Sequence, residues 1–148
     1  MFRLRSAAVL SIALVAVAFS IQTASAASLN VVDAWLRMPA PGTDMAAVYF
    51  TLRNVSPHTV MVEGAEAPDA RMAMIHESKV VNGKAQMRMR DNVVLAPGQT
   101  VTFAPNGLHL MLHGVHRKLL VGEKLPVMLL LSGGEKIAFT ATVRPLTQ

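Results

Sequence analysis

Turn-forming residues interrupt this chain at roughly 8- to 15-residue intervals, so only short elements of secondary structure fit between them. The intervening runs are rich in β-branched and apolar residues, and none shows the pattern of an amphipathic helix. Short strands at this spacing are typical of antiparallel β-sandwiches and barrels. The sequence therefore predicts an all-β domain whose strands are Leu29–Leu36, Ala46–Arg53, Thr59–Ala65, Ala73–Val81, Ala85–Met89, Thr100–Phe103, His109–Leu112, Val127–Leu131 and Lys136–Val143.

One turn carries a particularly specific signal. Asn82-Gly83 separates two strand-like runs, and this dipeptide favours the type I′ turn of a two-residue β-hairpin. The hairpin would place the strand that contains His76 beside the strand that contains Met87.

The N-terminus has the features of a secretory signal peptide. Arg3 and Arg5 precede an apolar stretch, and Ala24-Ser25-Ala26 forms a small-x-small cleavage site. We expect residues 1–26 to be removed, with cleavage after Ala27 as the alternative, and residues 27–148 to form one exported domain. The apolar stretch is shorter than the roughly 20 residues of a membrane-spanning helix, and we expect no stable membrane insertion.

Charge and motif content exclude several classes of function. After loss of the two signal arginines, 12 basic residues face 9 acidic ones, spread along the chain, which is no footprint for nucleic acid. No nucleophile elbow, phosphate-binding loop or suggestive carboxylate pair is present, so we do not expect an enzyme.

Ten methionines and no cysteine restrict the metal chemistry that this chain can support. On a strand, His109 and Met111 share one face, and His76 and Met87 offer a second pair of the same kind. Imidazole and thioether donors together suit copper, above all Cu(I). Blue-copper electron transfer normally needs a cysteine ligand, so that function is not expected. The sequence predicts a copper site of His76, Met87, His109 and Met111.

The spacing of these four residues resembles the H(M)-x10-M-x21-H-x-M signature of the periplasmic copper chaperones known as the PCuAC family. Other segments across nearly the whole predicted domain are similar to that family as well. They are Asp33–Arg37 with Pro41-Gly42, Ala47–Asn54, Leu95–Val101 and Pro105–Leu112.

The resemblance implies a cupredoxin-like Greek-key β-sandwich or barrel of short antiparallel strands. It implies a periplasmic protein, expected to be a monomer, that binds one Cu(I) and delivers it to a copper-accepting protein. The implied acceptors are an oxidase subunit, as in cytochrome c oxidase assembly, or a thiol-bearing assembly factor. Some relatives carry a His- and Met-rich C-terminal extension for Cu(II); this chain shows none, which weakens the case for a second site, and Cu(II) binding stays open.

The sequence allows more than one role for several other residues. Met89 shares a strand face with Met87 and is an alternative ligand, and Met74 would supply an extra sulfur unless it packs in the core. We expect His113 on the face of Met111, as an outer or exposed residue. The remaining candidates are interpreted as structural or solvated: His58 and His116 at the surface, Trp35 and Tyr49 as core anchors, and Asp33 with Arg37 as an ion pair.

Two other functions compete with the chaperone. One is a copper buffer or resistance protein without a dedicated acceptor, which a transfer assay would distinguish. The other is an exported interaction module in which these His and Met residues only pack, and which would not retain Cu(I).

Overall fold

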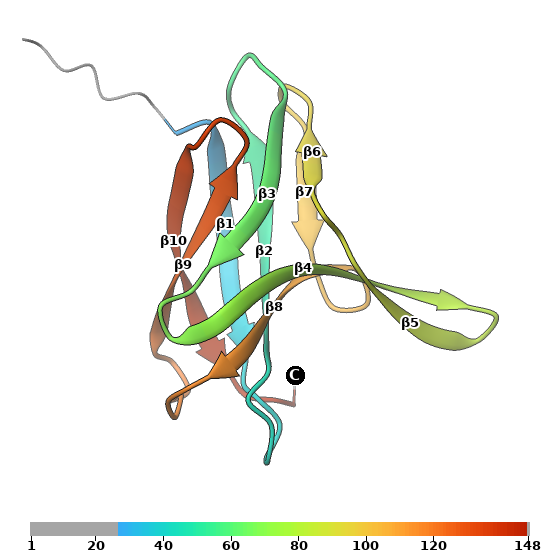
Figure 1. Cartoon of the computed structure of the whole chain (residues 1–148), viewed down its shortest axis with the longest axis vertical. Helices are drawn as coiled ribbons and strands as arrows, with labels where there is room; N and C mark the ends of the chain where they lie inside the picture. Colours follow the sequence, from blue (N-terminus) through green and yellow to red (C-terminus); the bar gives the residue numbers. More distant parts are fainter. Residues whose placement is uncertain (1–26, 148) are drawn as a thin grey trace, which may run out of the picture.

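The computed structural model describes residues 27–147, and the predicted signal peptide lies outside this range. Every element in the described range is a strand, so the all-β prediction is confirmed (Figure 1). The strands are β1 (Leu29–Arg37), β2 (Ala46–Asn54), β3 (Val60–Glu66), β4 (Ala70–Val81), β5 (Lys84–Met89), β6 (Val93–Leu95), β7 (Thr100–Phe103), β8 (Leu108–Val115), β9 (Lys124–Leu131) and β10 (Lys136–Arg144).

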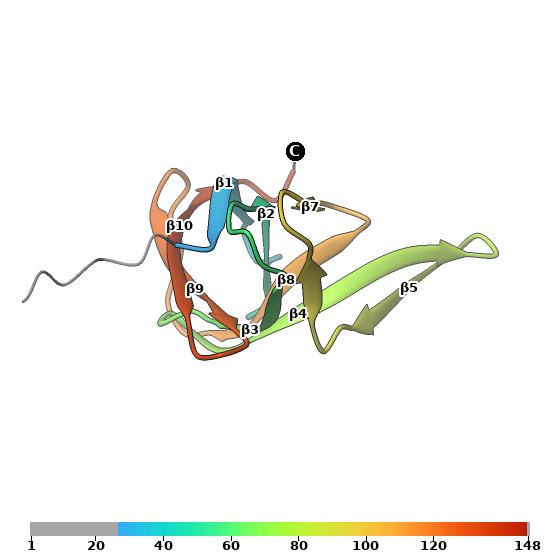
Figure 2. The same ribbon diagram turned by 90° about the horizontal axis from the view of Figure 1, so that it is seen from above.

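The strands close into a barrel. Hydrogen bonding runs through β4-β8-β2-β1-β10-β9-β3, and a pairing between β3 and β4 returns to the start. β5 and β6 extend this path at its two ends, and β7 pairs with β2. Seen from above in Figure 2, the strands form a ring, and the buried apolar residues make up one core cluster. The fold is the expected cupredoxin-like β-barrel.

One pairing departs from the expected antiparallel arrangement. β1 runs parallel to β10, with Trp35 opposite Thr142 and Arg37 opposite Arg144. The parallel pairing joins the first and last strands of the domain, which no hairpin connects. The sequence pattern gave no signal for it.

Apolar side chains fill the barrel from every wall. Phe50 stacks on Phe103 with ring centroids 4.4 Å apart, and Phe139 packs on Phe50 at 5.1 Å. Leu110 and Leu112 of β8 are fully buried among them. Because the chain has no cysteine, this apolar burial, and not a disulfide, stabilises the domain.

β1 contains an irregularity that overturns the predicted Asp33–Arg37 ion pair. The register with β2 shifts between Val32 and Trp35, and Asp33 has a φ of 54°. The alternation that would place Asp33 and Arg37 on one face is therefore broken, and their side chains form no ion pair in the described range. The Arg37 guanidinium lies over aromatic rings instead.

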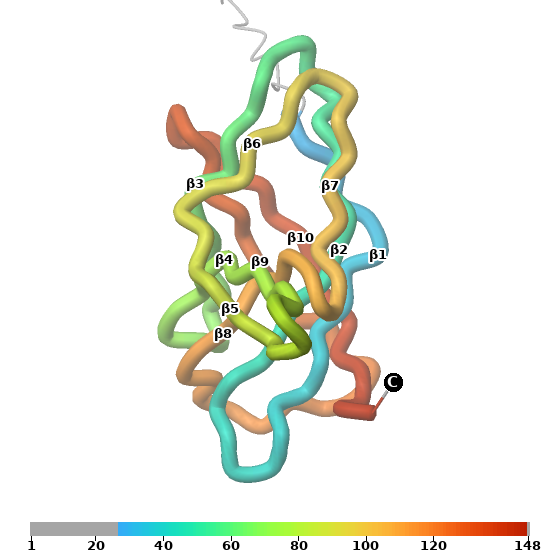
Figure 3. The backbone as a smooth tube through the Cα atoms, turned by 90° about the vertical axis from the view of Figure 1, so that its right-hand side faces the viewer, coloured from blue at the N-terminus to red at the C-terminus, as the bar shows by residue number. Residues whose placement is uncertain are grey.

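The β4–β5 hairpin projects from the barrel as an arm (Figures 1 and 2). Asn82 and Gly83 have φ values of 52° and 74°, as the predicted turn requires, and Val81 pairs with Lys84. Figure 3 views the arm end on, in front of the barrel and below β6 and β7. All six residues of β5 are exposed, so the arm carries Met87 and Met89 into solvent.

The strand boundaries otherwise agree with the sequence prediction to within three residues, except that β6 was missed. No helix in residues 27–147 could cross a membrane.

Candidate metal centre

Three adjacent strands bring eight His and Met side chains to one face of the sheet. In the register of β4 with β8, His76 is opposite His109, Met74 opposite Met111, and Met72 opposite His113. In the register of β4 with β5, His76 is opposite Met89, and Ser78 is opposite Met87. We call this surface the His/Met face; its members are Met72, Met74, His76, Met87, Met89, His109, Met111 and His113.

The face exists because β-strands alternate. Ile75 of β4 and Leu110 of β8, which pair with each other, point into the core and are buried. Their neighbours in sequence must therefore point to the opposite face of the sheet. Met74 lies outside the core cluster, opposite Met111, so core packing does not explain it.

His76 lies close to two of the other predicted ligands, Met87 and His109. Its Nδ1 atom lies 3.2 Å from the sulfur of Met87, and its ring centroid is 5.9 Å from that of His109. Met87 reaches His76 diagonally, from the position beside Met89 on the same face of β5. The structure thus brings His76, Met87 and His109 together, and Met111 follows His109 on the same face.

His109 is held by the backbone. The side chain is only 4% exposed, and its Nδ1–H donates to the carbonyl oxygen of Gly107 at 3.0 Å. The same carbonyl accepts the backbone N–H of Ser78 at 3.0 Å, which ties the loop to β4. With its proton on Nδ1, the imidazole keeps its lone pair on Nε2.

The surroundings of His76 favour its neutral form. Burial lowers the pKa of His76, and the positive charges of protonated His109 and His113 lower it further. A neutral imidazole has a lone pair to offer a metal, whereas an imidazolium has none.

Aromatic rings border the site on the β2 side. The ring of Tyr49 lies 6.3 Å from that of His109, and Trp35 packs on Tyr49 at 4.5 Å. Arg37 lies over both aromatic rings. Burial raises the pKa of Tyr49, and the charge of Arg37 partly opposes this. Tyr49 is buried, as the core-anchor interpretation expects, whereas Trp35 is only partly buried and packs on Tyr49 outside the core cluster.

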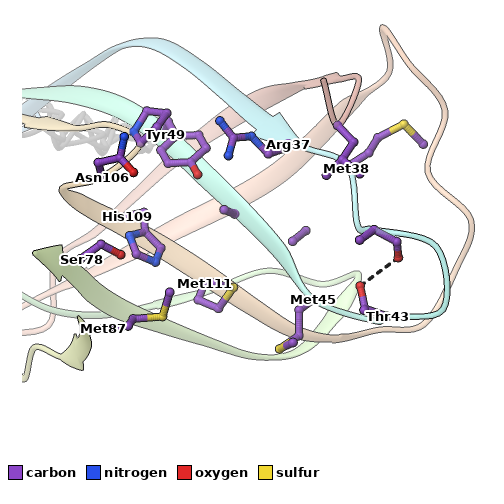
Figure 4. A pocket seen from close by; sticks show the side chains of 15 residues that line it. Arg37, Met38, Thr43, Met45, Tyr49, Ser78, Met87, Asn106, His109 and Met111 are labelled. Atoms are coloured by element: carbon purple, nitrogen blue, oxygen red, sulfur yellow. Dashed lines mark hydrogen bonds between the residues drawn. The ribbon is translucent and has the colours of Figure 1, made fainter. Parts of the chain in front are cut away.

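A groove of about 380 Å³ opens beside these residues (Figure 4). Met87, His109 and Met111 lie together along one side of it, and Tyr49 and Arg37 lie across from them. Sequence reasoning missed two further methionines of the groove, Met38 and Met45. Met45 precedes the Ala46–Leu112 pair, so only the register of β2 with β8 could have revealed it.

Two of the histidines, His58 and His116, lie outside the His/Met face. His58 and His116 are exposed, as expected. His113 lies on the His/Met face, as expected, and is only partly exposed.

The groups on the His/Met face that could bind a metal are imidazole nitrogens and thioether sulfurs. No group of three or more His, Asp or Glu side chains within residues 27–147 is arranged to hold a metal. Binding of a metal here therefore needs the methionine sulfurs, and neutral imidazole and thioether donors suit a soft, singly charged ion.

Comparisons with known proteins agree with this architecture. The family described as "Putative lipoprotein LpqE-like" matches residues 29–143. A relative from Leifsonia xyli subsp. xyli (strain CTCB07), named "Putative lipoprotein Lxx21020", is 33% identical over 107 residues. The match covers 72% of this chain and 63% of the relative, so the chain spans less than two thirds of that protein's length.

Solved structures share the fold. The copper-bound PCuAC domain from PmoF2 has a TM-score of 0.67 at 22% identity, over 82% of this chain and 97% of that domain. The solution structure of CuI-DR1885 from Deinococcus radiodurans has a TM-score of 0.62 at 27% identity, over 84% of this chain and 81% of that one. The PCuAC resemblance seen in the motif is thus confirmed in the fold. The chain belongs to the LpqE-like family and has the fold of the PCuAC domains.

Proposed function

We propose that this protein is a copper chaperone that binds one Cu(I) through His76, Met87, His109 and Met111 and passes it to an acceptor protein. The contact between His76 Nδ1 and the sulfur of Met87, at 3.2 Å, is the main observation in its favour. Two donors on one tetrahedral ion, with bond lengths like those of zinc sites, lie about 3.5 Å apart. These two atoms are therefore spaced almost as ligands of one ion would be.

The relatives support copper as the cargo. One matched PCuAC domain is described as copper-bound, and one matched protein as the CuI form. The two neutral imidazoles and two thioethers proposed here fit the same ion. A binding protein of this kind, and not an enzyme, is also what the absence of a catalytic motif in the sequence suggests.

Exposure of one side of the site favours transfer over storage. Met87 is 54% exposed on the projecting arm, whereas His109 is buried. An incoming ligand can displace the Met87 sulfur first while the histidines still hold the ion. Because thioethers are neutral, we expect them to bind Cu(I) less tightly than a thiolate pair, so transfer to a cysteine-based acceptor would be favourable.

The proposed setting is the periplasm, after removal of the signal peptide. The lipoprotein name of the matched family supports an exported protein. Copper-accepting proteins available there include an oxidase subunit or a thiol-bearing assembly factor of cytochrome c oxidase.

Metal analysis and X-ray absorption of the Cu(I)-loaded protein test the binding site. We expect one copper per chain with two nitrogen and two sulfur neighbours. His58→Asn serves as the matched control, since His58 is exposed and outside the His/Met face. Failure of the wild-type protein to retain Cu(I) after desalting would contradict the proposal and favour an interaction module.

A transfer assay then separates a chaperone from a buffer. The loaded protein is mixed with an acceptor that carries two thiols, and copper is measured in both after separation. Copper should move to the acceptor faster than it dissociates into a chelator. Transfer no faster than dissociation would instead indicate a storage protein.

A further inference from the structure

His113 has a buried ring nitrogen that makes no hydrogen bond with the rest of the described structure. Its Nε2 atom has no hydrogen-bond partner among the described residues. Buried polar atoms in proteins are nearly always paired, so such an atom calls for a partner that is not part of the chain. His113 lies on the His/Met face, opposite Met72 and two residues beyond Met111.

His76 has an imidazole neighbour on each side at nearly the same distance. Its ring centroid is 5.9 Å from that of His109 and 6.0 Å from that of His113. A metal bound through a ring nitrogen at about 2.0–2.1 Å lies about 3.2 Å from the ring centroid, so two ligating rings can be up to about 6.4 Å apart. Both separations fall below that limit, so each neighbour is near enough to share a metal ion with His76 when its ring nitrogen faces the ion.

The three imidazoles do not converge on a single ion. Within residues 27–147, no group of three or more His, Asp and Glu side chains can hold one metal together. Each pair of rings is close enough for one ion, so we interpret the two pairs as alternative positions that share His76.

We propose that His113 is a further copper ligand, which with His76 forms a second position for the same Cu(I) ion. This proposal rests on the function proposed above and extends it to the path that the cargo takes on the protein.

Thioethers are available at the second position. The Met74–Met111 pair lies between the His76–His109 pair and the Met72–His113 pair in the ladder. Side chains directly opposite each other on antiparallel strands are separated by about 4.5–5.5 Å at Cβ, within reach of methionine. Met74 and Met111 can therefore supply sulfur to an ion held by His76 and His113.

With two positions, the Cu(I) ion can move along the His/Met face without leaving the protein. With His76 retained as a ligand, the ion exchanges His109 for His113 and Met87 for Met74. The second position lacks Met87, the ligand on the exposed arm, so the two positions differ in how easily an acceptor reaches the ion.

A double-mutant cycle on His109 and His113, with Cu(I) and a competing chelator, tests the proposal. His109→Gln removes the first position and His113→Gln the second. We expect His109→Gln to keep Cu(I) binding, and the double variant to bind at least about tenfold more weakly than His109→Gln, since even outer-shell changes cost about 10- to 100-fold in metal affinity. His116→Gln is the matched control, because His116 is an exposed histidine three residues away.

Nitrogen-15 NMR of the imidazoles in the wild-type protein provides a measurement that needs no variant. Addition of one equivalent of Cu(I) should shift the Nε2 resonance of His113 and leave that of His116 unchanged. An unshifted His113, or equal affinities of His109→Gln and the double variant, would overturn the second position. The proposed function would still stand in that case if the wild type binds one Cu(I) through His76 and His109, and it fails separately if the wild type binds none.

Discussion

His109 donates its Nδ1–H to the carbonyl oxygen of Gly107, two residues earlier in the chain, at 3.0 Å. Asn106, with a φ of 64°, turns the backbone just before this carbonyl. The turn that precedes β8 therefore decides which nitrogen of His109 keeps its lone pair for a metal, before any metal arrives. Such a backbone contact fixes the tautomer and orientation of a metal-ligating histidine.

The tautomer can be checked directly. In the metal-free protein we expect His109 to carry its proton on Nδ1, with Nε2 unprotonated, as read from long-range nitrogen-15 correlation spectra. Cu(I) should then shift Nε2 far more than Nδ1. A proton found on Nε2 would contradict the hydrogen bond and with it the proposed orientation of this ligand.

The choice between Met87 and Met89 is a second prediction. Met87 contacts His76 and lines the groove that also contains His109 and Met111. Met89 lines two other cavities, and Arg90 lines both of them as well. We expect Met87→Leu to weaken Cu(I) binding at least about tenfold, as loss of a ligand should exceed the smallest outer-shell effects. Met89→Leu should change it little.

These two variants control for each other. Both side chains are more than half exposed on the same strand, so replacement by leucine should affect stability equally little. Chelator competition measures affinity and thermal unfolding checks the fold. The reverse order of affinities would assign the ligand to Met89.

The sequence predicted the strands and the ligand pairs for a simple reason: both depend on local alternation. His109 and Met111 had to share a face once β8 was recognised, and Asn82-Gly83 brought β5 back beside β4. The three residues of β6 were too few to show a pattern, and their pairing with β3 is purely long-range.

Other features depended on tertiary geometry that no local pattern encodes. The bulge at Asp33 reverses the alternation in β1, which turned Trp35 and Arg37 toward Tyr49. The opposition of Met74 and Met111 needs the β4–β8 register, which follows from how the whole barrel closes. The sequence could place these residues on strands but not beside one another.

A stability prediction concerns Asn54, a fully buried polar residue at the end of β2. Its amide nitrogen donates to the carbonyl oxygens of His58 and Leu95, and its side-chain oxygen accepts from Ser56. Asn54→Ala removes these hydrogen bonds, and a buried group left unsatisfied, here the Leu95 carbonyl, costs about 1–3 kcal/mol. We expect a loss of at least about 2 kcal/mol of unfolding free energy in denaturant titrations.

Copper binding should be spared in the same variant. Asn54 is five residues beyond Tyr49 on β2, about 16 Å along the strand from the groove. Arg53→Ala, at an exposed neighbouring position, should leave stability almost unchanged. A stable Asn54→Ala protein would mean that water replaces the side chain without loss.

The final prediction concerns pH and His76. Burial, together with the charges of His109 and His113, lowers the pKa of His76 below the ordinary imidazole value of about 6.5. The group is therefore neutral in the folded protein at pH values where it already takes up a proton in the unfolded chain. Its contribution to folding stability is complete above about pH 6.5 and is lost as the pH falls toward the lowered pKa.

The same shift sets where protons compete with copper for His76. Cu(I) binds the neutral ring, so competition at this residue begins only below the ordinary imidazole range. NMR titration of the metal-free protein should give His76 a midpoint below 6.5, and His113→Gln should raise that midpoint by removing one of the two nearby charges. A His76 midpoint at or above 6.5, unmoved by His113→Gln, would show that the two β8 histidines do not act on it. Chelator competition from pH 8 to 5 completes the test: binding should weaken in the acid part of this range, and a flat affinity throughout would remove the histidines from the copper site.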